Sequence, residues 1–423
     1  MKRCAYILFI MLIAAGLIGG GVMNRALVDQ RRTHRITQAD PLVNAPPLVV
    51  FTTVALGGFR GMVADMLWIR AANLQQQGNY FELVQLADWI TKLEPRFTEV
   101  WAYHAWNLAY NVSILFDDAA DRWRWIRHGI ELLRDEGLKY NPGDPGLLYE
   151  LGWLFQHKIG SDMDEGHWYY KKAWAAEMKE ALGSARMEQV YKIDPERMRF
   201  IDAQYGPLDW RLPQAHSLYW AAGSRELARS FDALMAQRMM YQSLVFAFRN
   251  GRLFTGRSGD LFVTSPSLDL WPNVIKAYEE AIAHPEDRGS TLPALHYFLQ
   301  EAIFYLYLYD QRSDAESCLA KLKEMNPDLS KTVELDAFFS SLMTNPEMSN
   351  NRDVAFALVE SFFYRAEIAR RAGQDALADE AASNAANAWR EFMEKTGRTP
   401  SLVERIGLPP LEQIQQSAAA RLP

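Results

Sequence analysis

Residues 78–95 read GNYFELVQLADWITKLEP. The stretch opens with Gly78 and Asn79, carries apolar residues three and four positions apart, and closes with Pro95. This is the spacing of the second helix and terminal proline of a tetratricopeptide repeat, a unit of two antiparallel helices. The proline ends the helix because it has no amide hydrogen and clashes with the preceding turn. The stretch therefore predicts a chain built from helical repeats.

Matching segments follow on the C-terminal side. Residues 101–108, WAYHAWNL, show the alternation of large and small residues expected of a first helix, and a second helix is predicted near 122–140, before Pro142. An insertion of about thirteen residues relative to the usual repeat of about 34 separates the two helices. A third unit begins with LYELGWLF at 148–155.

Small residues and a C-terminal array complete the pattern. Ala105 and Gly152 are expected to let the paired helices approach each other. Apolar residues at helical spacing return in two further helix pairs. The first pair has Leu299, Ile303 and Leu306 in one helix and Ala315, Leu319 and Leu322 in the other, and it ends at Pro327. The second pair has Phe362, Ala366 and Ala369 before a turn at Gly373, and Ala378, Ala382 and Ala385 after it.

The sequence thus predicts an all-α fold, a tetratricopeptide-like superhelical solenoid of helix hairpins preceded by one transmembrane or signal helix. Sustained two-residue alternation, which half-buried strands require, is missing from the sequence. We divide the chain into five segments: a membrane segment 1–23, a linker 24–45, an N-terminal array 46–205, an irregular middle with a C-terminal array 206–395, and a C-terminal cap or tail 396–423.

The first segment indicates the cellular location. Residues 4–23 are uncharged and mostly apolar, and a helix of about twenty such residues spans a bilayer core. They are predicted to be a single-pass anchor in the bacterial cytoplasmic membrane, with the body on the periplasmic or outer side. Gly19, Gly20 and Gly21 leave open a signal that is cleaved, which would release the protein into the periplasm.

Composition excludes other classes of protein. Acidic residues outnumber basic ones, 52 to 45, and the basic cluster Arg31, Arg32 and Arg35 is small, so nucleic-acid binding is not expected. Cys4 and Cys318 are too few for a disulfide framework or a thiolate metal site. No cofactor is expected.

Several stretches together resemble a known group of proteins. They are ALGGFRGMVADMLWIRA (55–71), QLADWITKLEPRFTEVWAYHAWNLAYN (85–111), RWRWIRHGIELLRDEGLKYNP (122–142), LYELGWLFQHKIG (148–160) and YGPLDWRLPQAHSLYWA (205–221). The chain resembles a group of bacterial membrane-anchored proteins with tetratricopeptide-like repeats. The resemblance implies a helical repeat fold and an envelope location, and it implies no catalytic residue, cofactor or substrate.

The repeat register predicts a binding surface for a protein partner, because first helices of such repeats line a concave groove. The groove positions are mainly aromatic, and Tyr and Trp combine a large contact area with a polar atom. Aromatic residues at helical spacing also pack in cores, and that interpretation stays open. The predicted groove residues are Trp68, Gln75, Gln76, Tyr103, Trp106, Tyr110, Tyr149, Glu150, Trp153, Gln156 and His157.

Two other functions are alternatives to a protein-binding scaffold. One is a helical-toroid glycan hydrolase or lyase with Glu150 as its acid, although no second carboxylate stands out. The other is a permanent structural subunit of an envelope secretion or pilus-like complex. The sequence contains none of the common catalytic motifs, and His104, His128, His157 and His167 are expected to pack or line the groove, not to bind metal. Asp117, Asp118 and Asp121 are expected in a solvated acidic loop.

Overall fold

The computed structural model of the chain describes residues 60–255, 261–284, 288–326, 332–345, 351–397 and 405–422, with isolated residues 19, 23, 26, 30, 329 and 403. The predicted membrane segment 4–23 and the linker 24–45 lie outside these ranges, as does Pro327. Among the described residues, no helix is both long and apolar enough to cross a bilayer.

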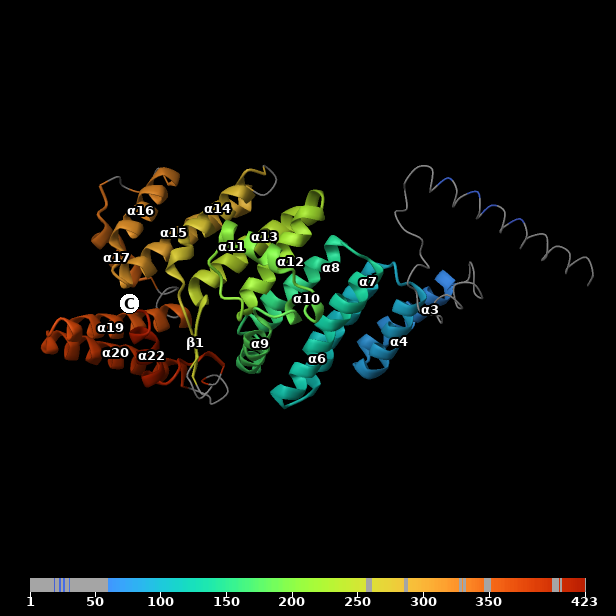
Figure 1. Cartoon of the computed structure of the whole chain (residues 1–423), viewed down its shortest axis with the longest axis horizontal. Helices are drawn as coiled ribbons and strands as arrows, with labels where there is room; N and C mark the ends of the chain where they lie inside the picture. Colours follow the sequence, from blue (N-terminus) through green and yellow to red (C-terminus); the bar gives the residue numbers. More distant parts are fainter. Residues whose placement is uncertain are drawn as a thin grey trace, which may run out of the picture.

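The predicted all-α fold is confirmed, since one two-stranded hairpin is the exception among the described elements. Helix pairs follow one another along the long axis of the molecule, from α3 and α4 at one end to α19 and α20 at the other (Figure 1). The N-terminal half contains α3 (Arg60–Gln76), α4 (Tyr80–Leu93), α5 (Thr98–Trp106), η2 (Asn107–Val112), η3 (Ser113–Leu115), α6 (Ala119–Glu131), η4 (Leu132–Gly137), α7 (Leu138–Tyr140), α8 (Pro145–Trp153), η5 (Leu154–Ile159), α9 (His167–Ala181), α10 (Arg186–Gln189) and α11 (Pro195–Tyr205).

The C-terminal half contains the hairpin and the longest helices. Its elements are α12 (Pro213–Leu227), α13 (Ser230–Asn250), β1 (Arg252–Thr255), β2 (Phe262–Ser265), η6 (Leu268–Leu270), α14 (Trp271–Ile282), α15 (Arg288–Leu308), α16 (Arg312–Met325), α17 (Leu335–Met343), α19 (Arg352–Arg371), α20 (Asp375–Thr396) and α22 (Leu411–Ala419). The antiparallel strands pair Arg252 with Ser265, which places an extended piece where the irregular middle was predicted. The described part of the predicted cap packs on α19 through α22.

One buried cluster runs from Trp101 to Ala357. It includes both the N-terminal and the C-terminal arrays, so it is continuous across the boundary predicted near residue 205. The six apolar positions predicted for the pair that precedes Pro327 are all buried in α15 and α16. In the last pair, Gly373 adopts a positive φ of 71°, which glycine accommodates without strain, and turns the chain between α19 and α20.

The predicted insertion in the second unit is not a loop. The first helix continues from α5 through the π-helical segment η2 to Leu115, and α6 begins already at Ala119. Leu108, Ala109 and Val112 are buried, so apolar packing extends the helix beyond the repeat's usual length. Asp117 and Asp118 are exposed and lie between the helices, as the expected acidic loop requires, whereas Asp121 lies in α6. Asp118 caps α6 by accepting hydrogen bonds from the amides of Ala120 and Asp121.

Two glycines allow close helix contacts, and only one of the contacts lies within a predicted unit. A Cβ atom on Gly129 would lie 2.9 Å from the carbonyl oxygen of Ala105, so α5 and α6 approach as predicted. A Cβ atom on Gly152 would instead meet α12, at 3.3 Å from the carbonyl oxygen of Ser217, and the sulfur of Met239. Gly152 therefore serves the contact with the following pair, not with its own partner helix.

Because of these two contacts, we expect a methyl group to lower the stability more at Gly129 than at Gly152. Gly129→Ala should destabilise the protein by about 1 to 3 kcal/mol, because backbone atoms of two packed helices must separate. Gly152→Ala should change the stability by less than about 1 kcal/mol, because the closest atom belongs to the flexible Met239 and alanine favours helix. Urea unfolding of both variants compares them, and equal losses would contradict this assignment.

Candidate functional site

Two neighbouring first helices present four aromatic side chains, which we call the aromatic face: Trp106, Tyr110, Trp153 and His157. Trp106 ends α5 and Tyr110 lies in η2, whereas Trp153 ends α8 and His157 lies in η5. The two π-helical segments contact each other. π-Helical turns are rare and occur often at functional sites, because they reposition side chains relative to an α-helix.

The four rings form a continuous ladder. Trp106 stacks on Tyr110 at 5.5 Å between ring centroids, and Trp153 stacks on His157 at 4.7 Å with an interplanar angle of 9°. The hydroxyl of Tyr110 lies 3.0 Å from Nδ1 of His157 and joins the two halves by a hydrogen bond. Trp106 is 38% exposed, and the other three side chains are half-buried. The ladder is therefore fixed by packing and remains accessible.

Charged groups beneath the ladder hold Tyr110 in place. The ammonium of Lys158 lies 5.0 Å from the centroid of the Tyr110 ring and donates to the carboxylate of Asp164 at 2.6 Å. Asp164 also accepts hydrogen bonds from the Tyr170 hydroxyl and the Gly166 amide. Burial raises the pKa of Asp164, but its hydrogen bond and ion pair with Lys158 outweigh this and lower the pKa overall. The carboxylate stays ionised and rigidifies the support.

Electrostatics keep the face uncharged near neutral pH. Burial, and then the charge of Lys158, lower the pKa of His157 below its usual value. Burial, and then the nearby Glu150, raise the pKa of Tyr110. Both groups are consequently neutral at pH 7. A neutral aromatic surface with polar atoms suits contact with a peptide segment of mixed character.

A second group of predicted residues lies at the junction of the first two units. Trp68 on α3 packs against Tyr103 on α5 at 5.0 Å between ring centroids, and the Tyr103 hydroxyl donates to Oε1 of Gln75 at 2.8 Å. The indole Nε1 of Trp68 is buried and has no hydrogen-bond partner. An unsatisfied donor of this kind costs free energy until an acceptor reaches it. Gln76 is exposed.

The remaining predicted positions divide between surface and core. Tyr149 and Glu150 on α8 are half-buried, and burial raises the pKa of Glu150. Gln156 was predicted to line the groove, but it is buried and donates to the carbonyl of Met239 and the hydroxyl of Ser243 on α13. The α-helical register does not hold there, because Gln156 lies in the π-helical η5.

The four histidines take different positions. His104 is buried without a partner for either nitrogen, and burial lowers its pKa to about 4. His128 stacks on Trp125, and His157 belongs to the aromatic face. His167 contacts the buried Lys171 and lines a pocket. No cluster of three or more potential ligands for a metal ion occurs among the described residues.

Large apolar side chains are also exposed outside the aromatic face. Trp89 on α4 is 51% exposed, and Phe81 on the same helix lies edge-on to Phe116 and Trp125. These residues belong to second helices or the following loop, which the groove register does not include. They provide matched comparisons for any test of the aromatic face.

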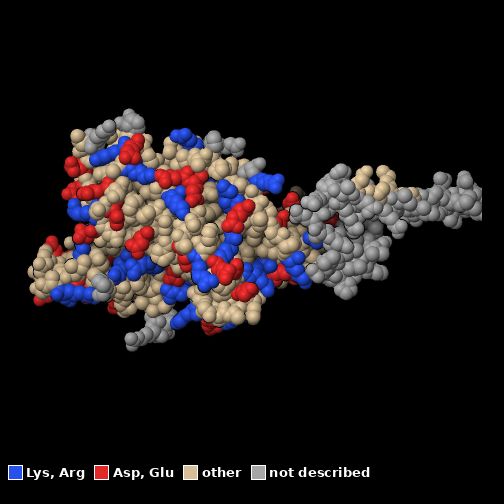
Figure 2. Space-filling model, turned by 45° about the horizontal axis from the view of Figure 1, so that its top comes forward, with Lys and Arg blue, Asp and Glu red and all other residues tan. Residues whose placement is uncertain are grey.

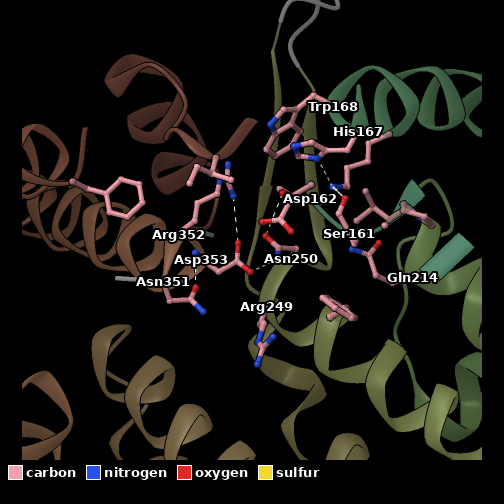
Figure 3. A pocket seen from close by; sticks show the side chains of 18 residues that line it. Ser161, Asp162, His167, Trp168, Gln214, Arg249, Asn250, Asn351, Arg352 and Asp353 are labelled. Carbon is pink, nitrogen blue, oxygen red and sulfur yellow. Dashed lines mark hydrogen bonds and ion pairs between the residues drawn. The ribbon is translucent and has the colours of Figure 1, made fainter. Parts of the chain in front are cut away.

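A polar pocket that the repeat register did not predict lies between the two halves of the chain (Figure 3). It has a volume of about 400 Å³ and receives side chains from α9, α12, α13, β2 and α19. Figure 3 shows Trp168 and His167 on one side, Arg352 and Asp353 on another, and Arg249 below. Arg352 is the first residue of α19, and a basic residue there was the available signal in the sequence, because the helix dipole disfavours it.

The charged surface carries no dominant sign on the side shown in Figure 2, where Lys, Arg, Asp and Glu alternate over the body. This agrees with the small formal net charge of −7 for 423 residues. A surface of mixed charge does not attract a polyanion over long range.

Comparisons with models of protein families, with curated proteins and with solved structures find no match to this chain.

Proposed function

We propose that the chain is a membrane-anchored scaffold of the bacterial cell envelope that binds a protein partner. Its helix pairs would form a tetratricopeptide-like superhelical solenoid, residues 4–23 would anchor it in the cytoplasmic membrane, and the body would lie on the outer side. Release into the periplasm after signal cleavage is the alternative location. The resemblance of residues 50–222 to membrane-anchored repeat proteins supports both the repeat fold and the envelope location.

The observation that carries the proposal is the accessible aromatic ladder. Trp106 and Trp153 lie on adjacent helices. Trp106 stacks on Tyr110, and Trp153 stacks on His157. Accessible tryptophan and tyrosine side chains that are already held in place lose little conformational entropy on binding, so they are common energetic anchors of interfaces.

Loss of the aromatic face should weaken partner binding without unfolding the chain. Trp106→Ala and Trp153→Ala should each reduce affinity by about 2 kcal/mol or more, roughly 30-fold. The measurement is quantitative affinity capture of the detergent-extracted full chain, with mass spectrometry of the bound proteins and a melting curve for each variant. Trp89→Ala removes a more exposed tryptophan from α4 and serves as the control, which should capture the partner normally.

Capture of the partner and a separate assay of glycan cleavage would distinguish the alternatives. A stoichiometric set of membrane proteins that survives washing would favour a permanent structural subunit. Release of soluble sugar from envelope glycan, lost in Glu150→Gln, would favour the helical-toroid hydrolase, whose acid needs the raised pKa that burial gives Glu150. If both aromatic variants keep full capture, the proposed face does not bind the partner.

A further inference from the structure

Three helices begin at the wall of the polar pocket. Its lining includes His167 and Trp168 from the first turn of α9, Pro213 and Gln214 from that of α12, and Arg352 and Asp353 from that of α19, together with Lys171 from the second turn of α9. The residues that precede α9 and α12 supply no side-chain cap to the free amides. Helix N-termini carry partial positive charge, so their convergence favours an anion in this space.

Lys171 is a buried cation without a carboxylate partner. Its ammonium donates to the carbonyl of Ser161 at 2.9 Å and lies 2.8 Å from Nδ1 of His167, and it is 8% exposed. His167 Nε2 lies 2.9 Å from the carbonyl of Arg405, which places the ring proton on Nε2 and leaves Nδ1 as the acceptor for Lys171. Two acceptors leave one of the three ammonium protons available.

A second cation lies close to Lys171. The guanidinium carbon of Arg352 lies 4.7 Å, and the ammonium of Lys171 5.1 Å, from the centroid of the Trp168 ring. Arg352 donates to the carbonyl of Gly407 and pairs with Asp353 at 3.3 Å. Burial, and then the charge of Arg352, lower the pKa of Lys171 to about 7. Like charges at two helix N-termini lack a full counter-charge in the pocket.

The pocket also holds an unsatisfied polar side chain. Gln214 is 7% exposed, and its Oε1 is buried without a hydrogen-bond partner. Figure 3 shows its carboxamide on the same side of the pocket as Ser161. Oxygen and nitrogen of an amide exchange by a simple flip, so this group can accept from or donate to a ligand. A buried amide that the protein itself does not satisfy is available to a ligand or to water.

Acidic groups compensate part of the positive charge. Asp353 accepts from Arg352 and from Asn250, and Asp162 is exposed at the rim. Arg249 is neutralised by a bidentate pair with Glu301. The ammonium of Lys171 and the amide of Gln214 therefore remain for a ligand after the internal pairs are accounted for.

We propose that this pocket binds a small molecule through an oxyanion group, a phosphate or a carboxylate, which contacts Lys171, Gln214 and the N-terminus of α12. The volume of about 400 Å³ is within the range of small-molecule sites and is larger than an inorganic oxyanion needs. The site lies on other helices than the aromatic face, so each can fail without the other.

The test is calorimetric titration of the full chain in detergent with inorganic phosphate, sulfate and succinate, at an ionic strength held constant with chloride. We expect at least one oxyanion to bind, and the comparison of phosphate with succinate distinguishes phosphate from carboxylate recognition. Lys171→Met should weaken binding about tenfold or more. Lys172→Met, which removes an exposed neighbouring charge on the same helix, should leave binding unchanged.

Two further measurements separate a binding role from a structural role. Gln214→Met keeps the side-chain volume and removes an unsatisfied group, so the melting temperature should not fall while affinity does. Sulfate affinity should fall as the pH rises from about 6 to about 8, since sulfate does not titrate there but Lys171 loses its proton. Absence of binding by all three oxyanions, or unchanged binding in both Lys171→Met and Gln214→Met, would overturn the proposal. Should Lys171→Met not fold, the Gln214→Met titration decides.

Discussion

Trp101→Ala should lower the free energy of unfolding by about 3 to 5 kcal/mol, the range for removing a large aromatic side chain from a packed core. Trp101 is 1% exposed, stacks on Tyr140 and donates from Nε1 to the carbonyl of Pro95 at 3.0 Å. Asn141 donates to the same carbonyl. The substitution therefore loosens the junction between the first two units as well as leaving a cavity.

A conservative variant separates the contribution of the buried ring from that of the hydrogen bond to Pro95. Trp101→Phe keeps most of the buried ring and loses the hydrogen bond to Pro95, so it should cost about 1 to 2 kcal/mol. Urea unfolding followed by far-ultraviolet circular dichroism measures both variants. A loss below about 1 kcal/mol for Trp101→Ala would contradict the placement of this residue in the core.

Arg421→Met should destabilise the chain by about 3 to 5 kcal/mol, because it leaves a buried carboxylate without its cation. Glu360 on α19 is fully buried, and its Oε2 accepts from Arg421 Nε at 3.0 Å and from the Tyr309 hydroxyl at 2.5 Å. Arg421 also donates to the hydroxyl of Ser265 at the end of β2. One side chain near the C-terminus thus joins α19, α15 and the hairpin.

A double variant tests the electrostatic origin of that loss. In Glu360→Gln with Arg421→Met the buried charge is gone and Gln keeps a hydrogen bond to Tyr309, so most of the stability should return. Thermal unfolding of the wild type, both single variants and the double variant completes the cycle. If the double variant is no more stable than Arg421→Met alone, packing and not charge explains the effect.

Local periodicity predicted much of the fold. The apolar spacing of residues 78–95 and the prolines at 95 and 142 predicted helices that the structure has as α4 and as the run from α6 to α7. The signal is strong because each helix must bury one stripe of side chains against its neighbours. On the same helix Trp101 is buried, whereas Trp106, a predicted groove position, is 38% exposed.

Departures from the regular α-helix could not be predicted in this way. The π-helical segments η2, η4 and η5 add residues within a helix, so positions beyond them no longer follow the α-helical register. This explains why Gln156, in η5, is buried. The sequence has no residue type that marks a π-helical turn.

The polar pocket could not be predicted for a different reason. His167, Gln214 and Arg352 are separated by long stretches of chain and meet only because α9, α12 and α19 converge. In a repeat protein each unit contacts only its neighbours, so the repeat pattern does not predict contacts between distant units. The burial of Lys171 in the second turn of α9 depends on the same distant contacts and has no signal in the sequence.

Site-specific photo-crosslinking in cells directly tests whether the aromatic face binds a protein. The photoreactive amino acid p-benzoylphenylalanine would replace Trp106, Trp153 or Trp89 in the full chain, and cells would be irradiated before extraction. We expect the same crosslinked partner from positions 106 and 153 and none from position 89, although Trp89 is 51% and Trp106 38% exposed. Equal crosslinking at position 89, or no crosslinked partner from positions 106 and 153, would contradict the claim that the aromatic face binds a protein.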